Sequence, residues 1–368
     1  MNSVVFRRIG DYLTRHLDGA LLGFLLALMA VGLIVLASAS NANAARVTAQ
    51  ATNMLIALGV LWAFANIPPH YLMRLALPLY VLGLGLLIGV ATMGEVVNGA
   101  RRWLDIGVTR IQPSELMKIA VPLALAWYFD RYGATLRLSN YAIGAIMLMV
   151  PVAMIARQPD LGTGILILAS GFFVLFLAGL SWRVIIGLAI AGTAALPFAW
   201  SALHDYQRQR ILTLLDPSQD PLGSGYHTIQ STIAVGSGGL FGKGWMHGTQ
   251  THLDFIPERT TDFIFAVYAE EFGLLGIMLL LGLFLLVIGR GMLITANAPT
   301  LFARLLAGAI TLTFFTYAFV NMGMVSGILP VVGVPLPLVS YGGTSLVSIC
   351  LGFGILMSIA SHKKLVQT

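Results

Sequence analysis

Charged side chains inside or at the ends of apolar runs are the residues of this sequence best suited to chemistry. Glu115 and Lys118 stand at i, i+3 in one such run, so they share a helix face and can form an ion pair. Asp160 lies at the end of another run, and Asp262 opens a third. Ionisable groups are expensive inside a bilayer, so by default they are candidates for function.

The competing interpretation is that these acids and bases neutralise one another and pin helices together. We favour this structural interpretation for Glu270 and Glu271, which lie two turns beyond Asp262 in the same run. For Asp262 itself we favour a functional role. An anionic side chain at a helix N-terminus is also stabilised by the helix dipole, which is the structural alternative for this residue.

The elements that must position these residues follow from the composition. Of 368 residues, 58% are hydrophobic and only 10% are charged, and the mean hydropathy is +0.87. A soluble protein of this size needs more polar side chains to cover its surface, so we exclude a soluble enzyme, a disordered protein and a nucleic-acid binder. The net charge of +6 reflects few acids, and the single cysteine, Cys350, excludes a disulfide framework. The chain is predicted to be a polytopic membrane protein.

Apolar runs of about 20 residues predict membrane-spanning helices. We predict an all-α protein with about ten of them, forming a single transmembrane domain over residues 1–368. Arg7, Arg8, Lys363 and Lys364 favour a cytoplasmic N-terminus and C-terminus by the positive-inside rule. A large extracytoplasmic loop, 204–262, then joins spans seven and eight. The predicted spans are 19–38, 50–67, 74–94, 115–129, 141–157, 163–180, 184–203, 263–289, 305–325 and 344–360.

Two glycine- and proline-rich segments of the outer side do not fit a regular helix. Gly236–Gly244 looks like a phosphate-binding loop, but Ser237 replaces the first glycine of that motif and no strand precedes it. Pro335 and Pro337 break the segment 334–343. Irregular backbone near membrane depth is tolerated only inside protein or along a wet cavity. We therefore predict a cavity on the outer face, walled by basic residues and a few carboxylates.

Seven ordered segments of the chain combine charged or polar residues with glycine and proline: Gly99–Asp105, Gln112–Lys118, Gln158–Thr163, Tyr226–Ser231, Gly238–Gly244, Pro257–Phe265 and Pro335–Gly343. Together they resemble the SEDS family of shape, elongation, division and sporulation proteins, and the resemblance covers nearly the whole chain. Arg259 after Glu258 is similar to the elongation branch of that family, whereas Thr260 stands where the family usually has histidine.

The resemblance implies a peptidoglycan glycosyltransferase that polymerises lipid II at the outer face of the bacterial cytoplasmic membrane, for cell elongation and rod shape. It implies lipid II and its undecaprenyl carrier as ligands. A class B penicillin-binding transpeptidase and other membrane proteins of the elongation complex are the implied partners, with no nucleic acid. Two alternatives stay open: a lipid II flippase, and a non-catalytic scaffold of the elongation complex.

An α-linked donor and a β-linked product imply one inversion, so a single base is sufficient, and Asp262 is our candidate. The leaving pyrophosphate needs positive charge, and we expect Lys118 to supply part of it. A divalent cation, Mg or Mn, on Asp160 or Glu115 is an alternative source. The expected substrate-binding residues are Arg101, Arg102, Trp103, Glu115, Lys118, Asp160, Arg208, Arg210, Lys243, Glu258 and Ser340.

Overall fold

The computed structural model describes residues 15–97, 100–105, 110–133, 136–202, 208, 212–213, 216, 224–253, 255–256 and 258–362. Within this part of the chain a long helix occurs at each of the ten predicted positions. Seven of them are long and apolar enough to cross a membrane, so the chain is a multi-pass helical membrane protein. The ten helices are α2 (Gly19–Ala39), α3 (Ala44–Ala65), α4 (Pro69–Met93), α5 (Pro113–Tyr132), α6 (Leu138–Ala156), α7 (Leu161–Leu177), α8 (Trp182–Ala202), α12 (Ile264–Ala296), α13 (Leu301–Val325) and α14 (Gly343–Ser361).

The fourth helix extends beyond its predicted limits at both ends. The expected span 115–129 is the middle of α5, which begins at Pro113 and ends at Tyr132. Proline is favoured in the first turn, where its missing N–H costs nothing. Charged residues at both ends, Glu115, Asp130 and Arg131, shorten the apolar run and hide the true helix ends in the sequence.

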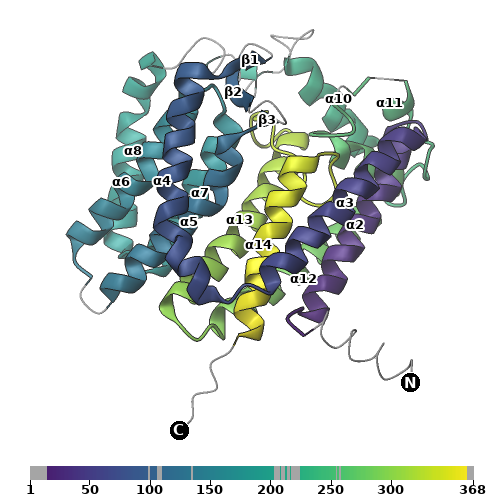
Figure 1. Cartoon of the computed structure of the whole chain (residues 1–368). Coiled ribbons are helices and arrows are strands. Elements are labelled where there is room, and N and C mark those ends of the chain that lie inside the picture. Colours follow the sequence, from purple (N-terminus) through teal and green to yellow (C-terminus); the bar gives the residue numbers. More distant parts are fainter. Residues whose placement is uncertain are drawn as a thin grey trace, which may run out of the picture.

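The all-α prediction needs one correction, because a short antiparallel sheet lies between α4 and α5. Its strands are β1 (Glu95–Val97), β2 (Ala100–Asp105) and β3 (Arg110–Ile111), in the order β1-β2-β3. The strands are too short for a period-2 pattern to stand out, which is why the sequence did not predict them. The sheet sits over the helix ends opposite the two chain termini (Figure 1) and carries Arg101, Arg102 and Trp103 on β2.

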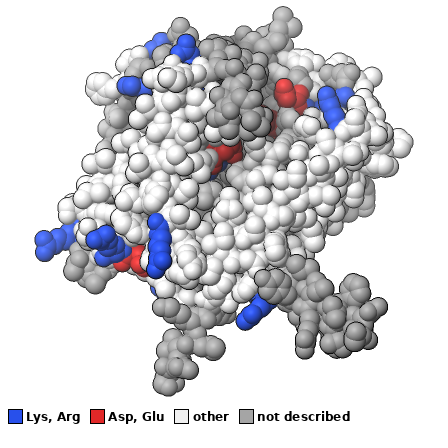
Figure 2. Space-filling model, viewed as in Figure 1, with Lys and Arg blue, Asp and Glu red and all other residues white. Residues whose placement is uncertain are grey.

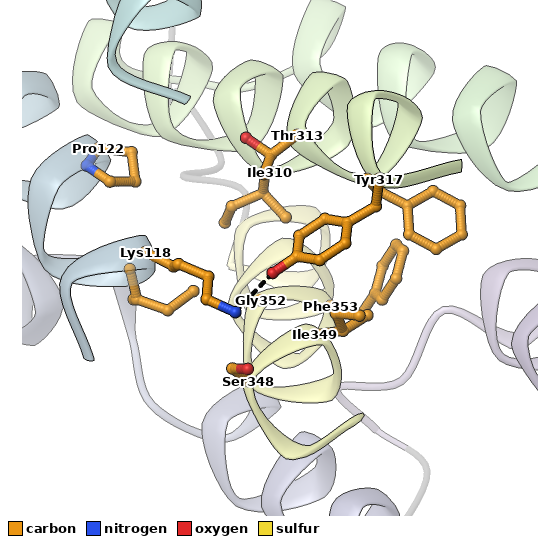
Figure 3. A pocket seen from close by; sticks show the side chains of 11 residues that line it. Lys118, Pro122, Ile310, Thr313, Tyr317, Ser348, Ile349, Gly352 and Phe353 are labelled. Carbon is orange, nitrogen blue, oxygen red and sulfur yellow. Dashed lines mark hydrogen bonds between the residues drawn. The ribbon is translucent and has the colours of Figure 1, made fainter. Parts of the chain in front are cut away.

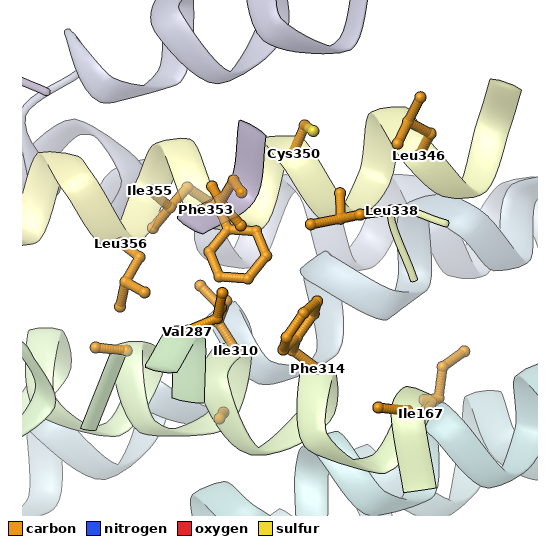
Figure 4. Packing of buried hydrophobic residues seen from close by; sticks show 14 of the residues in the cluster. Ile167, Val287, Ile310, Phe314, Leu338, Leu346, Cys350, Phe353, Ile355 and Leu356 are labelled. Atoms are coloured by element: carbon orange, nitrogen blue, oxygen red, sulfur yellow. The ribbon is translucent and has the colours of Figure 1, made fainter. Parts of the chain in front are cut away.

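Helix α13 lies at the centre of the bundle and packs against α5, α7, α12 and α14. Phe314 of α13 makes a T-shaped contact with Phe353 of α14, with ring centroids 5.0 Å apart (Figure 4). Helices α14 and α3 approach so closely that a Cβ on Gly354 would lie 2.5 Å from the Leu61 carbonyl oxygen. Small residues at such crossings are typical of helix packing in membranes.

Both ends of the described chain lie on the same side of the bundle, since the rings of His16 and His362 stack with centroids 4.5 Å apart. The sheet and the short helices α10 (Ser224–Ser237) and α11 (Thr249–His252) lie at the opposite end (Figure 1). Figure 2 shows most basic side chains at these two ends, separated by a largely uncharged band. This charge distribution is that of a membrane-embedded protein.

Candidate active site

Lys118 lies near the sheet end of the bundle, in a polar cluster contributed by three helices. Its Nζ lies 2.7 Å from Glu115 Oε1 on α5 and donates to the Tyr317 hydroxyl on α13, also at 2.7 Å (Figure 3). Ser348 of α14 donates to the other Glu115 oxygen, Oε2, at 2.8 Å. The Lys118 side chain is only 8% exposed, and Glu115 supplies the anion that a buried ammonium requires. The predicted pair is therefore present.

A narrow cavity of about 40 Å³ extends from Lys118 between α5, α13 and α14. Three of its polar groups, Lys118, Tyr317 and Ser348, lie close to one another (Figure 3). Thr313 lies apart from them, with its hydroxyl donating to the Ala309 carbonyl, and most of the remaining wall is apolar. The apolar lining comprises Ile119, Pro122, Ile310, Phe314, Ile349 and Phe353. One cation beside an apolar slot is suited to a ligand with an anionic group and a hydrocarbon chain.

Asp160 caps the N-terminus of α7 and is buried. Its Oδ1 accepts from the Thr163 backbone N–H at 3.3 Å, and its Oδ2 accepts from Gln112 Nε2 at 3.1 Å. Gln112 precedes α5, so this bond ties the start of α7 to the helix that carries Lys118. Arg102 of β2 donates to the backbone carbonyls of Gln158 and Pro159. These bonds tie the sheet to the turn that precedes α7.

Glycines bring this turn against the segment that faces Asp262. A Cβ on Gly162 would lie 2.7 Å from the Val332 carbonyl oxygen, so a larger residue would push the two segments apart. Gly333 follows Val332 and has φ +73°, a conformation that favours glycine. A Cβ on Gly333 would lie 3.4 Å from Asp262 Oδ2. The backbone of Val332 and Gly333 therefore lies between the Asp160 turn and the Asp262 carboxylate.

Asp262 lies in the turn that precedes α12, outside the helix, and is partly buried. Burial, and then the nearby Glu258 carboxylate, raise the pKa of Asp262 to about 6. A carboxylate whose pKa lies close to neutral is a stronger base than an ordinary aspartate and is still ionised at pH 7. This is the electrostatic environment expected of a general base.

The proline-rich segment fixes the backbone before Asp262, and it is non-helical as predicted. The Ser340 hydroxyl donates to the Thr261 carbonyl oxygen at 2.6 Å, and the Tyr341 N–H donates to the Thr260 carbonyl at 2.9 Å. Gln50 of α3 donates in turn to the Ser340 carbonyl at 3.1 Å. Ser340, which we expected to bind substrate, here uses its hydroxyl to position the Asp262 turn.

Asn321 is a site residue that the sequence analysis missed. Its Nδ2 donates to the backbone carbonyls of Asp262, at 2.8 Å, and Val334, at 2.7 Å, and its side chain is fully buried. Tyr317, the partner of Lys118, lies one turn earlier on the same face of α13. One helix face therefore sets the position of Asp262 relative to Lys118. A buried amide inside an otherwise apolar span was the available signal.

We expect Asn321→Leu to lower the polymerisation rate by about 10²-fold, because small misplacements of a reacting group have effects of that size. The measurement is a comparison of initial rates for purified variants at equal concentration. Asn297→Ala is the matched control, since that exposed amide donates only to the Leu293 carbonyl at the end of α12. A fully active Asn321→Leu variant would show that the link to Asp262 is dispensable.

Other predicted residues lie away from this arrangement or in structural roles. Lys243 forms an ion pair with Glu270 of α12, with Nζ 2.7 Å from Oε1. Arg208 donates to the carbonyls of Trp200 and Ser201 at the end of α8. Glu258 is exposed and accepts from the Thr261 hydroxyl at 2.8 Å. Arg210 lies outside the described residues, and Arg101 and Trp103 stand on β2 above the bundle.

The residues named for a divalent cation already have protein partners. Both oxygens of Glu115 are engaged, by Lys118 and Ser348, and both oxygens of Asp160 accept from Thr163 and Gln112. No group of three or more His, Cys, Asp or Glu side chains suited to a metal occurs among the described residues. The donor set does not fit a dedicated metal site.

Comparison with known proteins places this site in a family context. Residues 19–365 match the family described as cell cycle protein, which groups FtsW, RodA and SpoVE. The chain belongs to this family. The resemblance to SEDS proteins is thereby confirmed. The peptidoglycan glycosyltransferase MrdB of Escherichia coli K12 is 52% identical over 354 residues, 96% of this chain and 95% of the relative. MrdB of Helicobacter pylori J99 is 38% identical over 95% and 91%.

Solved structures agree with the family assignment. One comes from work on the coordination of polymerization and crosslinking by a peptidoglycan synthase complex. Its TM-score is 0.81 at 35% identity, covering 93% of this chain and 97% of that one. The rod shape determining protein RodA of Thermus thermophilus has a TM-score of 0.71 at 30% identity, covering 93% and 96%. The names of these FtsW/RodA/SpoVE relatives confirm the predicted enzyme class, a peptidoglycan glycosyltransferase.

Proposed function

We propose that this enzyme polymerises lipid II by inverting glycosyl transfer, with Asp262 as the general base and Lys118 as a pyrophosphate-binding group. The observation that carries the proposal is the shared face of α13. Tyr317 there binds Lys118, and Asn321 there holds the backbone of Asp262. The base and the cation are thus positioned by one rigid element, as a two-substrate transfer requires.

In the proposed step, Asp262 accepts the proton of the acceptor sugar 4-hydroxyl. The hydroxyl oxygen forms a bond to C1 of the donor sugar while the bond from C1 to the pyrophosphate oxygen breaks. The electron pair leaves with undecaprenyl pyrophosphate, and Lys118 stabilises the new negative charge. The N-termini of α5 and α7, which flank Gln112 and Asp160, add favourable dipoles for an anion.

The cavity beside Lys118 supports the lipid part of this assignment. Its apolar wall provides a surface for the hydrocarbon chain of the substrate, and Lys118 at its polar end would bind the pyrophosphate. When the site is empty, Glu115 neutralises the ammonium. Binding of pyrophosphate would give Lys118 a second anionic partner, while Glu115 keeps the hydrogen bond that Ser348 donates to it.

Ten spans with a cytoplasmic N-terminus and C-terminus complete the proposal, in the bacterial cytoplasmic membrane and as one transmembrane domain. Arg7, Arg8, Lys363 and Lys364 favour this orientation. The loop 204–262 and the turn with Asp262 then face the outer side. The expected partners are a class B penicillin-binding transpeptidase and other elongation-complex proteins. One solved relative comes from a complex that coordinates polymerization and crosslinking.

The pH dependence of the reaction tests the role of Asp262. Only the ionised carboxylate can accept a proton, and its pKa is raised to about 6. We therefore expect kcat/KM to rise with pH and level off above about 6. Because Glu258 contributes to the raised pKa, Glu258→Gln should shift this acid limb to lower pH, whereas Glu258→Asp should leave it nearly in place. An acid limb unaffected by Glu258→Gln would contradict this electrostatic account.

A lipid II flippase is the alternative that needs a direct test, since buried charges also occur in transporters. Against it, Asp160, Asp262 and the Lys118 group gather at one end of the bundle. Purified protein supplied with lipid II on the Asp262 side should form glycan polymer. Movement of lipid II across the bilayer without polymer would favour the flippase. A scaffold role would be supported if Asp262→Asn left growth and partner binding intact.

A further inference from the structure

The glycine-rich segment Gly236–Gly244 has no part in the proposed reaction, but it contacts an unusual helix. Helix α12 is interrupted at Gly273, whose φ of 62° and ψ of −162° are accessible essentially only to glycine. The interruption leaves backbone N–H and C=O groups without partners inside the helix. Such groups must be satisfied by other atoms when they lie at membrane depth.

The segment 238–245, called the splint loop below, supplies those partners. The N–H groups of Lys243 and Gly244 donate to the carbonyls of Glu270 and Glu271, at 3.0 and 2.9 Å. On the other side of the break, the N–H groups of Leu274 and Leu275 donate to carbonyls of Gly239 and Leu240 in the splint loop, at 2.9 and 3.1 Å. Four backbone hydrogen bonds thus fix the loop against the broken helix.

Two observations place the splint loop below the outer surface of the membrane. Arg290 of α12 pairs with Asp18 at the start of α2, and the break at Gly273 is only about 26 Å along α12 from Arg290, which is less than the roughly 30 Å of a hydrocarbon layer. In addition, Trp245 Nε1 donates to the Ile34 carbonyl oxygen at 3.1 Å. Ile34 lies inside α2, about 7 Å before its outer end at 1.5 Å per residue. The loop is therefore level with the last turns of a membrane-spanning helix.

The outward side chains of the loop are apolar. Phe241 is 79% exposed and Leu240 is 61% exposed. They adjoin Leu274 and Leu275, which are also exposed and begin the apolar surface of α12 that continues with Met278 and Leu279. The exposed apolar side chains of the loop thus extend the surface that this helix presents to lipid.

The charge carried by the splint loop is neutralised. Lys243 is the one charged residue of the splint loop, and its ammonium is paired with Glu270. Glu270 is fully buried and also accepts hydrogen bonds from Thr249, Gln250 and Thr251 of the following segment. A charge at membrane depth is tolerated when it is paired in this way. The structural interpretation of Glu270 in the sequence is thereby supported.

We propose that the splint loop is a re-entrant membrane anchor whose Leu240 and Phe241 side chains contact acyl chains of the outer leaflet. The loop fastens the extracytoplasmic segment 246–262, which leads to Asp262, to the lipid. Its occupant is lipid rather than a partner protein, because the loop continues the lipid-facing surface of α12 and lies below the end of α2.

Depth measurement by electron paramagnetic resonance tests this proposal. A nitroxide is attached at Phe241→Cys in a Cys350→Ala background, and the purified chain is reconstituted in phosphatidylethanolamine–phosphatidylglycerol nanodiscs. We expect the label to collide frequently with oxygen and rarely with a water-soluble nickel chelate, as at Leu279→Cys on the exposed face of α12. Arg101→Cys, at an exposed position of β2, is the water-accessible control.

Leu240→Cys provides a second, independent position and should give the same result as Phe241→Cys. Labels at both positions that behave like Arg101→Cys would overturn the proposal. Labels that are water-accessible in lipid, but become shielded when a partner protein is added, would overturn it in favour of a protein contact. Both substitutions replace highly exposed side chains, and thermal unfolding of each variant checks that its fold is intact.

Discussion

Asp262→Asn should lower the rate of lipid II polymerisation by about 10²–10⁴-fold, the usual contribution of a general base. The amide has nearly the same shape as the carboxylate, so the hydrogen bond from Asn321 to the residue 262 carbonyl is retained. Initial rates of glycan formation by purified enzyme measure the effect. Since the amide cannot accept the proton, the residual rate should also lose the acid limb that the Asp262 pKa produces.

Ser340→Ala is a useful companion to Asp262→Asn. It removes a hydrogen bond to the Thr261 carbonyl and leaves the carboxylate in place. We expect a smaller loss of rate with the acid limb retained, because the base is displaced and not removed. An Asp262→Asn enzyme with an ordinary rate would contradict the assignment of the base, whatever the behaviour of Ser340→Ala.

Lys118→Met is expected to lower the polymerisation rate by about 10²–10³-fold, the typical cost of removing one preorganised group that stabilises a transition-state charge. Methionine has a similar length, so the apolar part of the side chain is largely preserved. Glu115 remains hydrogen-bonded to Ser348, and we expect membrane insertion and thermal stability to stay near those of the wild type. Polymerisation assays and thermal unfolding of the same preparation separate the two effects.

The double variant Lys118→Met with Glu115→Leu distinguishes a catalytic cation from a structural pair. An isolated buried ion pair is often replaceable by apolar residues with little loss of stability. If the pair served only to join α5 to α13, the double variant would be stable and fully active. In our account it is stable and inactive, because nothing replaces the positive charge beside the pyrophosphate.

The helices could be predicted from their long apolar runs. The break within one helix and the short sheet between two others could not. The first helix was expected at 19–38 and occurs at Gly19–Ala39, because its apolar run is uniform. The break at Gly273 left no trace in the sequence, since glycine is common in membrane helices. The sheet carrying Arg102 was missed because its strands are short. Local patterns do not reveal such features, which depend on contacts with distant segments.

The ionised residues of the candidate site could be predicted from the sequence, because charged side chains are energetically unfavourable in a membrane and therefore rare there. The neutral residues that position them could not. Glu115 with Lys118 stood out because ionised groups are rare in apolar runs. Lys243 was expected to bind substrate as one of the basic residues of the predicted outer loops, yet the structure pairs it with Glu270. Tyr317 carries no such signal, since tyrosine is ordinary in a membrane helix. Its role depends on the packing of α13 against α5.

The measurement that tests the central claim most directly uses the purified chain in liposomes, with lipid II supplied on the side that Asp262 faces. Glycan strands and released undecaprenyl pyrophosphate are quantified together with any movement of lipid II to the other leaflet. We predict polymer with a β-linkage, one undecaprenyl pyrophosphate released per bond formed, and loss of both with Asp262→Asn. Transfer of lipid II across the bilayer without polymer, or polymer that keeps the donor's α-configuration, would contradict the account.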